Sequence, residues 1–297
     1  MDTERLRILR ELADRGTVAA TAATLNMTPS AVSQQLKVLA REAGVALLEP
    51  DGRRVRLTDA GRALVLRAED VLGALAHAEA EMESYRGSPR GTVRVAMFPS
   101  GASLLLPGLL DRIEGVELVA GDEDYPASDV NRLLADYDVV LTHRDERAPS
   151  TAAPRVAVRT LMREPIDLVL PATHRFADAE SVDIHDLAGE RWISVRGGFP
   201  VDDVLNSIAT VTGIQPRVVQ RINDFRVTEE LVAHGHGVAL MPRYASTHPA
   251  VKRTRIAGVR AARIYELATR PGAERRPAIA SVVTAFEKQA MSVQQPG

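Results

Sequence analysis

Residues 17–63 read TVAATAATLNMTPSAVSQQLKVLAREAGVALLEPDGRRVRLTDAGRA, and this stretch decides the fold of the N-terminal region. Thr28 and Pro29 predict a helix start, because a hydroxyl N-cap satisfies an unpaired backbone N–H and proline at the first helical position has none to lose. Gly44 predicts the matching stop. Between them, apolar residues spaced by four, three and four positions predict one buried face. These residues are Val32, Leu36, Leu39 and Ala43.

The opposite face of this predicted helix is polar. At about 100° per residue, one side collects Ser30, Ser33, Gln34, Lys37 and Arg41. Gln34 and Lys37 can make hydrogen bonds to base edges or phosphates, and the two serines are short enough to allow close approach to DNA. An ordinary solvated helix face is the alternative. The capped start, the helix before it and the basic segment after it favour DNA reading.

The flanking segments complete a winged helix-turn-helix. Residues 4–14 carry leucines at helical spacing, and residues 17–25 form a small-residue helix that can pack closely. Beyond Gly44, apolar residues 45–48 and 55–57 flank Asp51-Gly52, a pair favoured in hairpin turns. The second arm carries Arg53, Arg54 and Arg56. We assign Arg53 and Arg54 to phosphate or minor-groove contacts, where charge matters more than geometry.

A long helix is predicted from Thr58 to about Arg86. Small and apolar residues recur along it every seven positions in two series: Gly61, Ala68, Leu75 and Met82, and Leu64, Val71 and Ala78. Such a heptad pattern is typical of a helix that pairs with a copy of itself. Packing against its own C-terminal region is the alternative. The apolar stripe along this helix is narrow, and a single winged helix-turn-helix reads few base pairs. Both features favour a homodimer or homotetramer.

Composition limits the class of protein. With 297 residues, 45% hydrophobic and 26% charged, the chain is globular and long enough for two or three domains. The net charge is -2, yet residues 1–67 hold 11 basic against 8 acidic residues, so nucleic-acid contact is expected at the N-terminus. Cysteine is absent, which excludes disulfides and thiolate sites. With no apolar h-region and no apolar run of about 18 residues, we expect a soluble, cytoplasmic protein.

The remaining sequence alternates strand-like and helix-like segments, which predicts two α/β units with mostly parallel sheets. The turn Pro99 to Ser103 presents hydroxyls and backbone N–H groups at a helix start, where either an anion or a plain N-cap is possible. His234 and His236 lack a third ligand, so no metal site is predicted. Since no nucleophile elbow or phosphate loop is present, we expect neither a catalytic residue nor a cofactor.

The segment 17–63 resembles the DNA-binding signature of the LysR-type transcriptional regulators of bacteria. The resemblance continues more loosely through GTVRVAMFPSGASLLLPGLL, EPIDLVLPATHRFAD, DLAGERWIS and LVAHGHGVALMP at residues 91–110, 164–178, 186–194 and 231–242. It implies a multi-domain α and α/β fold: a winged helix-turn-helix, a linker helix and two Rossmann-like subdomains of the periplasmic-binding-protein type. Pro50 departs from the family pattern, which often has arginine there, and Ala40 and Ala43 replace a common Glu and Leu.

The resemblance also implies site residues. Base-edge contacts fall at Pro29, Ser30, Ser33 and Gln34, next to the capping Thr28. A small-molecule effector of unknown identity binds between the subdomains. Residues matched to the family's cleft, together with the turn after the first strand, give this effector set: Ser100, Gly101, Ser103, Thr142, His143, Arg196, Gly198, Phe199, Asp224 and Phe225. Arg196 can pair either with an acidic effector or with a surface carboxylate.

The expected domains are a winged helix-turn-helix at 1–58, a linker helix at 59–86 and a hinge at 87–91. Effector subdomain I covers 92–162 plus 269–297, and subdomain II covers 163–268. We therefore expect a ligand-responsive transcriptional regulator whose partners are double-stranded DNA, a second copy of itself and a small molecule, with RNA polymerase as a further candidate. The alternatives are an α/β enzyme or a solute-binding domain, each with an N-terminal dimerisation module.

Overall fold

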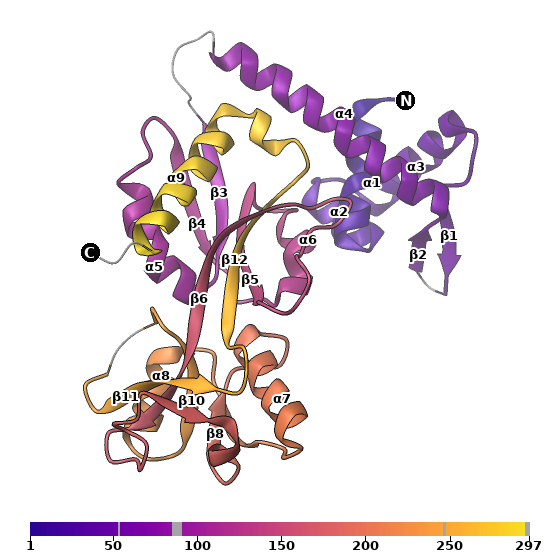
Figure 1. Cartoon of the computed structure of the whole chain (residues 1–297). Helices are drawn as coiled ribbons and strands as arrows, with labels where there is room; N and C mark the ends of the chain where they lie inside the picture. Colours follow the sequence, from indigo (N-terminus) through magenta and orange to yellow (C-terminus); the bar gives the residue numbers. More distant parts are fainter. Residues whose placement is uncertain (53, 85–90, 246–247, 295–297) are drawn as a thin grey trace.

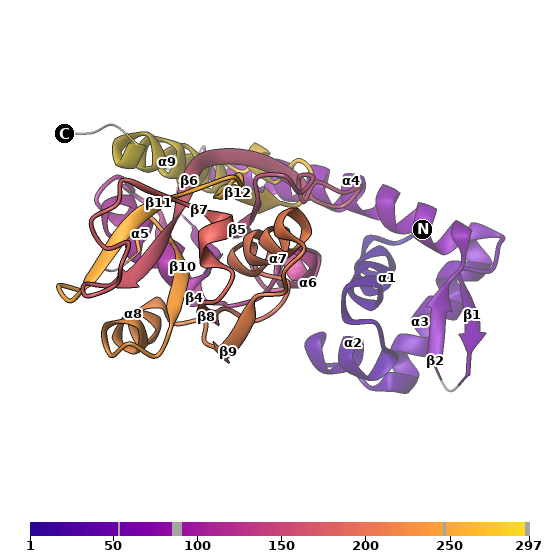
Figure 2. The same cartoon turned by 60° about the horizontal axis from the view of Figure 1, so that its bottom comes forward.

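The structure is a computed structural model that describes residues 1–52, 54–84, 91–245 and 248–294. An N-terminal helical head, a long helix and two α/β bodies follow one another along the chain (Figure 1). Figure 2 shows the head beside the α/β bodies, with α4 reaching from one to the other. Within the described ranges, no helix combines the length and the apolar character needed to cross a membrane.

The head consists of α1 (Thr3–Arg15), α2 (Val18–Thr24) and α3 (Pro29–Ala43), followed by the antiparallel strands β1 (Leu48–Asp51) and β2 (Arg54–Leu57). The predicted cap is present, since the Thr28 side chain accepts a hydrogen bond from the Ala31 N–H at 3.2 Å. Gly44 ends α3 at φ 71°, in the left-handed region. The predicted first arm at 45–48 was placed too early, because Leu47 packs into the head's core and the strand starts only at Leu48.

Helix α4 (Asp59–Ser84) divides its heptad residues between two environments. Gly61 and Ala68 are buried against the chain's own head, whereas Leu75 and Met82 are exposed, as is Val71 of the second series. The first half of the helix therefore packs against the N-terminal head, an arrangement that neither interpretation of the heptads predicted, and self-pairing stays a prediction for the exposed second half. Arg86, the predicted end of this helix, and the predicted hinge up to residue 90 lie outside the described residues.

Gly61 is a position where a side chain has no room. A Cβ built there would lie 2.1 Å from the backbone oxygen of Leu47. Gly61→Ala should therefore lower the free energy of unfolding of the head by about 1–3 kcal/mol, the usual cost of overpacking. Gly73→Ala on the same helix is the matched control, because its Cβ would lie 3.8 Å from the nearest atom, Pro271 O. Equal loss of stability in both variants, measured by chemical denaturation, would contradict this reading.

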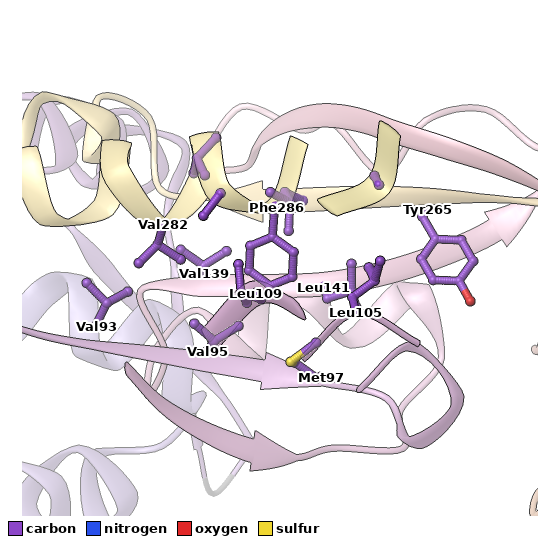
Figure 3. Packing of buried hydrophobic residues seen from close by; sticks show 14 of the residues in the cluster. Val93, Val95, Met97, Leu105, Leu109, Val139, Leu141, Tyr265, Val282 and Phe286 are labelled. Atoms are coloured by element: carbon purple, nitrogen blue, oxygen red, sulfur yellow. The ribbon is translucent and has the colours of Figure 1, made fainter. Parts of the chain in front are cut away.

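The first α/β body, subdomain I, is built on β3 (Thr92–Met97), β4 (Glu117–Asp122), β5 (Val139–Asp145) and β12 (Ala262–Thr269). Its helical elements are α5 (Pro99–Leu110), η1 (Ala127–Asp129), α6 (Val130–Leu133), η3 (Ala273–Arg275) and α9 (Pro277–Gln294). Figure 3 shows how the core closes: Phe286 of α9 packs over Val95 and Leu141 of the sheet and Leu109 of α5. The alternating apolar residues of β3 thus face a helical layer.

The second body, subdomain II, repeats the α/β plan. Its elements are β7 (Ser181–Asp183), η2 (Ile184–Leu187), β8 (Arg191–Ser194), α7 (Pro200–Thr212), β9 (Arg217–Arg221), α8 (Phe225–Ala233), β10 (Val238–Pro242) and β11 (Val251–Ala257). Trp192, which is 2% exposed, lies in its main core. Strands β7 and β11 were not predicted, because they are short or carry alternating charges.

One long strand, β6 (Ala157–Pro171), belongs to both bodies. It pairs with β12 from Ala157 to Pro165 and with β10 and β11 beyond that point. The expected second boundary at 268/269 differs from the structure, because β12 pairs with β5 from Arg263 to Thr269 and so lies in the sheet of subdomain I. The sequence of β12 does not reveal which of the two sheets this strand joins.

Candidate nucleic-acid interface and ligand cleft

Helix α3 presents the predicted polar face to the outside. Thr28, Pro29, Ser30, Gln34 and Lys37 are exposed and Ser33 is half-buried. The opposite face holds Val32 and Leu39, neither of which has measurable exposure. The helix therefore offers hydroxyl, amide and ammonium groups on a surface of modest bulk, as major-groove reading requires.

Contacts from α1 hold α3 in place. Arg5 Nε donates to Gln35 Oε1 at 3.0 Å, and Arg5 Nη1 donates to Glu42 Oε1 at 2.6 Å. These bonds engage the side of α3 next to the core. They leave Gln34, the neighbouring amide, at the surface.

The wing carries basic residues beside this face. Arg54 and Arg56 are both exposed and alternate with the partly buried Val55 and Leu57, so the two arginines share one side of β2. Arg56 pairs with Glu49 across the hairpin at 3.0 Å, which reduces its free charge. Arg53, the other predicted wing contact, lies outside the described residues. Arg54 is therefore the described arginine best suited to a phosphate.

A cavity of about 500 Å³ lies between the two subdomains. Six predicted effector residues line it: Ser100, Ser103, His143, Phe199, Asp224 and Phe225. They come from α5, β5, the segment before α7 and the start of α8, so the sheet topology brings together residues far apart in sequence. A few polar groups beside aromatic side chains, here Phe199 and Phe225, are typical of a small-molecule site.

Four predicted effector residues lie elsewhere. Gly101 is buried under the Phe98 ring, and Thr142 is 5% exposed on the side of β5 opposite His143. Gly198 lines a neighbouring cavity of about 360 Å³. Arg196 pairs with Asp124 of subdomain I, so the structure satisfies its charge within the protein. Asn223 donates to the same carboxylate at 2.8 Å, which ties the subdomains together at one edge of the cleft.

The segment Pro99 to Ser103 is helical and not a turn, contrary to the sequence-based expectation. Pro99 occupies the first position of α5, and the N–H groups of Gly101 and Ala102 already donate to Phe98 O at 3.0 and 2.9 Å. The supply of backbone donors for an anion is therefore smaller than expected, and the hydroxyls of Ser100 and Ser103 become the main polar groups here.

Sequence reasoning missed Arg263, the central residue of the cleft floor. This arginine of β12 is 1% exposed and donates from Nε to Glu164 Oε2 at 2.8 Å. Its Nη atoms reach His143 Nδ1 at 3.0 Å, Ser100 Oγ at 3.1 Å and the Tyr265 hydroxyl at 2.6 Å. One guanidinium thus orients His143, Ser100 and Tyr265. The sequence did offer one signal for this residue, because Arg263 and Glu266 are charged residues inside the otherwise apolar segment ARIYELA at 262–268.

The contact with Arg263 fixes the tautomer of His143. Since the guanidinium can only donate, Nδ1 must accept and the ring proton lies on Nε2. Burial, and then the Arg263 charge, hold the pKa of His143 well below its usual range. The ring stacks on Phe98 with centroids 4.0 Å apart. Nε2 is buried and has no hydrogen-bond partner among the described residues, so the hydrogen-bonding capacity of its proton is unsatisfied in the structure.

The buried neutral His143 predicts acid sensitivity. Below about pH 6.5 the unfolded chain protonates this histidine while the folded chain keeps it neutral, so its contribution to stability is present at higher pH and is lost as pH falls. His143→Asn should reduce the slope of unfolding free energy between pH 7.5 and 5.5, which approaches about 1.4 kcal/mol per pH unit for one such group. Identical slopes in the parent protein and in His143→Asn would refute this.

Among the described residues, no group of His, Asp and Glu is placed to hold a metal ion. His234 and His236 are exposed, and their rings lie 6.4 Å apart. The His234 ring contacts Glu230 O at 2.8 Å, as expected for a helix-ending turn.

Comparisons with known proteins agree with this architecture. A family model described as "LysR substrate binding domain" matches residues 86–290, and one described as "Bacterial regulatory helix-turn-helix protein, lysR family" matches residues 3–62. The transcriptional dual regulator GltC of Bacillus subtilis is 27% identical over 259 residues, covering 84% of each chain. The regulator ShiR of Corynebacterium glutamicum is 28% identical, covering 73% of this chain and 74% of its own.

Solved structures show the same fold along the whole chain. Full-length OxyR from Pseudomonas aeruginosa superposes with a TM-score of 0.67 at 20% identity, covering 97% of this chain and 98% of that one. Full-length CbnR in complex with its target DNA superposes with a TM-score of 0.56 at 22% identity, covering 98% and 100%. At these identities the likeness establishes the fold.

Proposed function

The chain belongs to the LysR-type transcriptional regulators, and from this premise we propose which of its residues read DNA, pair the subunits and bind the effector. It is a DNA-binding regulator with an effector-binding domain. Its relatives are transcriptional regulators and not enzymes. We propose that it acts on chromosomal DNA in the cytoplasm, with RNA polymerase as a further partner.

Helix α3 enters the major groove in this proposal. The observation that carries it is the separation of the helix into a buried apolar face and an exposed face with Ser30, Gln34 and Lys37. Gln34 makes base-edge hydrogen bonds, Ser30 and Ser33 allow close approach, and Arg54 contacts phosphate beside the groove. The solved complex of CbnR with its target DNA shows that this fold accommodates duplex DNA.

The free half of α4 pairs two copies of the chain. Val71, Leu75 and Met82 are 44%, 40% and 54% exposed, and they continue the heptads whose first half is already buried in the head. A second α4 would cover this stripe and bring two heads onto one duplex. Leu75→Asp should therefore shift the protein toward a monomer in sedimentation analysis.

The cleft binds a small molecule through neutral donors. Its two arginines already have acidic partners, because Arg263 binds Glu164 and Arg226 binds Asp224. Ser100 Oγ accepts from Arg263, so its own hydroxyl hydrogen can donate to a ligand. Together with Ser103 and His143 Nε2, it would hold the oxygen atoms of a ligand whose apolar part lies against Phe199 and Phe225.

Two assays test the proposed function. Fluorescence anisotropy with duplexes from the DNA flanking the protein's own gene should give site-selective binding that weakens as salt rises. Binding that is equal on scrambled duplexes would contradict DNA reading by α3. A thermal-shift screen of the full chain against amino acids and aromatic acids should give a hit that Ser100→Ala weakens. A hit that keeps its full shift in Ser100→Ala would contradict the cleft assignment.

A further inference from the structure

Four charged residues meet where the head, the linker helix and subdomain I come together. Asp14 lies in the last turn of α1, Glu69 lies on α4, Arg155 precedes β6, and Arg270 follows β12. Arg270 reaches Asp14 Oδ2 at 2.6 Å and Glu69 Oε1 at 3.1 Å. Arg155 reaches Asp14 Oδ1 at 2.8 Å and Glu69 Oε1 at 2.7 Å. We call these four residues the ionic junction.

The ionic junction is buried and balanced in charge. The side chains of Asp14 and Glu69 are 0% and 6% exposed, and those of Arg155 and Arg270 are 14% and 16% exposed. Burial raises the pKa of Asp14 and lowers that of Arg270, in each case against the opposing effect of the opposite charges around it. Removing one partner of a buried ion pair leaves an uncompensated buried charge, so a change at Asp14 alone should weaken the attachment of the head to subdomain I.

A second contact fixes the rotation of the head. Arg15, next to Asp14, donates from both Nη atoms to the carboxylate of Asp136, just after α6, at 2.9 and 2.6 Å. This fork geometry sets direction as well as distance. With the ionic junction, it gives the C-terminal end of α1 two points of attachment on subdomain I.

Strand β12 connects this attachment to the ligand cleft. Arg263 at its start forms the cleft floor, and Arg270 directly follows its end, roughly 24 Å away at the usual rise of an antiparallel strand. Between them Glu266, which is 0% exposed, accepts from the Thr151 N–H and hydroxyl at 3.2 and 2.8 Å. It thereby holds the segment that leads to Arg155. Both arginines of the ionic junction therefore depend on β12.

We infer that the ionic junction positions the DNA-binding head on subdomain I, and that β12 couples this position to the state of the cleft. A shift of Arg263 on ligand binding moves a rigid strand whose far end holds the head. In a dimer, the positions of the two heads set the spacing of the half-sites that the protein can reach. The regulatory part of this inference rests on the proposed function. The position of the head on subdomain I rests on the contacts of the ionic junction alone.

Distance measurements on the full chain test the inference without DNA or effector. The sequence has no cysteine, so Ala19→Cys on α2 and Thr284→Cys on α9, both exposed, create the only labelling sites. Spin labels there, diluted with excess unlabelled chain, report the distance within one chain by double electron–electron resonance. We expect one narrow distribution in the parent protein, and a broadened or second population in Asp14→Asn combined with Arg15→Gln.

Glu4→Gln is the matched control, because it removes an acidic residue from the exposed start of α1 and should leave the distribution unchanged. If circular dichroism shows that the double variant is folded, and its distance distribution superimposes on that of the parent, the inference is overturned. Should the double variant not fold, Arg15→Gln alone decides, because its pair with Asp136 is partly exposed: broadening supports the inference and superposition overturns it. Failure of DNA binding alone would leave these distances unchanged.

Glu266→Gln tests the coupling through β12. It alters no residue of the head, yet it weakens the bonds that hold the segment before Arg155. We expect a broadened distribution in this variant too. A folded Glu266→Gln protein with the parent's narrow distribution would overturn the coupling through the strand.

Discussion

Replacing Arg263 by methionine is expected to lower the free energy of unfolding by about 3–5 kcal/mol, the usual cost of removing one partner of a buried ion pair. Glu164 is 0% exposed, so its charge would stay in the interior, and the Tyr265 hydroxyl and the Tyr244 N–H would be its remaining donors among the described residues. His143 and Ser100 would each lose a donor as well. Denaturant unfolding of the full chain measures the effect.

Two variants check that the loss of stability comes from the unpaired charge of Glu164. Arg226→Met removes an 81% exposed arginine that lines the same cleft and should change stability by less than about 0.5 kcal/mol. Adding Glu164→Gln to Arg263→Met should recover part of the loss, because it removes the unpaired charge. If Arg263→Met is as stable as Arg226→Met, Arg263 does not hold the cleft floor together.

Gln34→Ala is expected to weaken specific DNA binding by about 5- to 150-fold for each α3 engaged, which corresponds to the 1–3 kcal/mol of a good bidentate base contact. Gln34 is exposed at the centre of the polar face, and its loss leaves the head's core untouched. Affinity for unrelated duplexes should therefore stay nearly constant. Titrations of cognate and scrambled duplexes at one fixed salt concentration measure the ratio.

Lys37→Ala provides the contrast, because an ammonium contacts phosphate without regard to sequence. It should weaken binding to both duplexes alike and reduce the salt dependence by about one unit of slope. A Gln34→Ala protein that loses affinity for both duplexes equally would instead place Gln34 among the phosphate contacts.

The head was the most predictable part of the chain. The cap at Thr28, the stop at Gly44 and the spacing of Val32, Leu36 and Leu39 are local signals, and the structure confirms α3 from Pro29 to Ala43. Such signals act within a few residues, so neighbours in sequence suffice to read them. The exposed face of α3 follows directly from the same spacing.

The cleft was less predictable because its partners are distant in sequence. Arg263 and Ser100 touch across 163 positions, and no local pattern announces such a contact. The contact between Asp124 and Arg196 was unpredictable for the same reason, because the two residues are 72 positions apart. The ionic junction likewise joins Asp14 to Arg270 across 256 positions. Long-range polar contacts of this kind become visible only once the sheet order is known.

Hydroxyl-radical footprinting of the full protein on the DNA flanking its own gene tests the DNA-reading surface most directly. We expect two protected half-sites, separated by whole helical turns, whose protection is lost in Gln34→Ala and kept in Glu4→Gln. Uniform protection along the duplex, or a footprint that Gln34→Ala leaves intact, would show that α3 does not read the DNA.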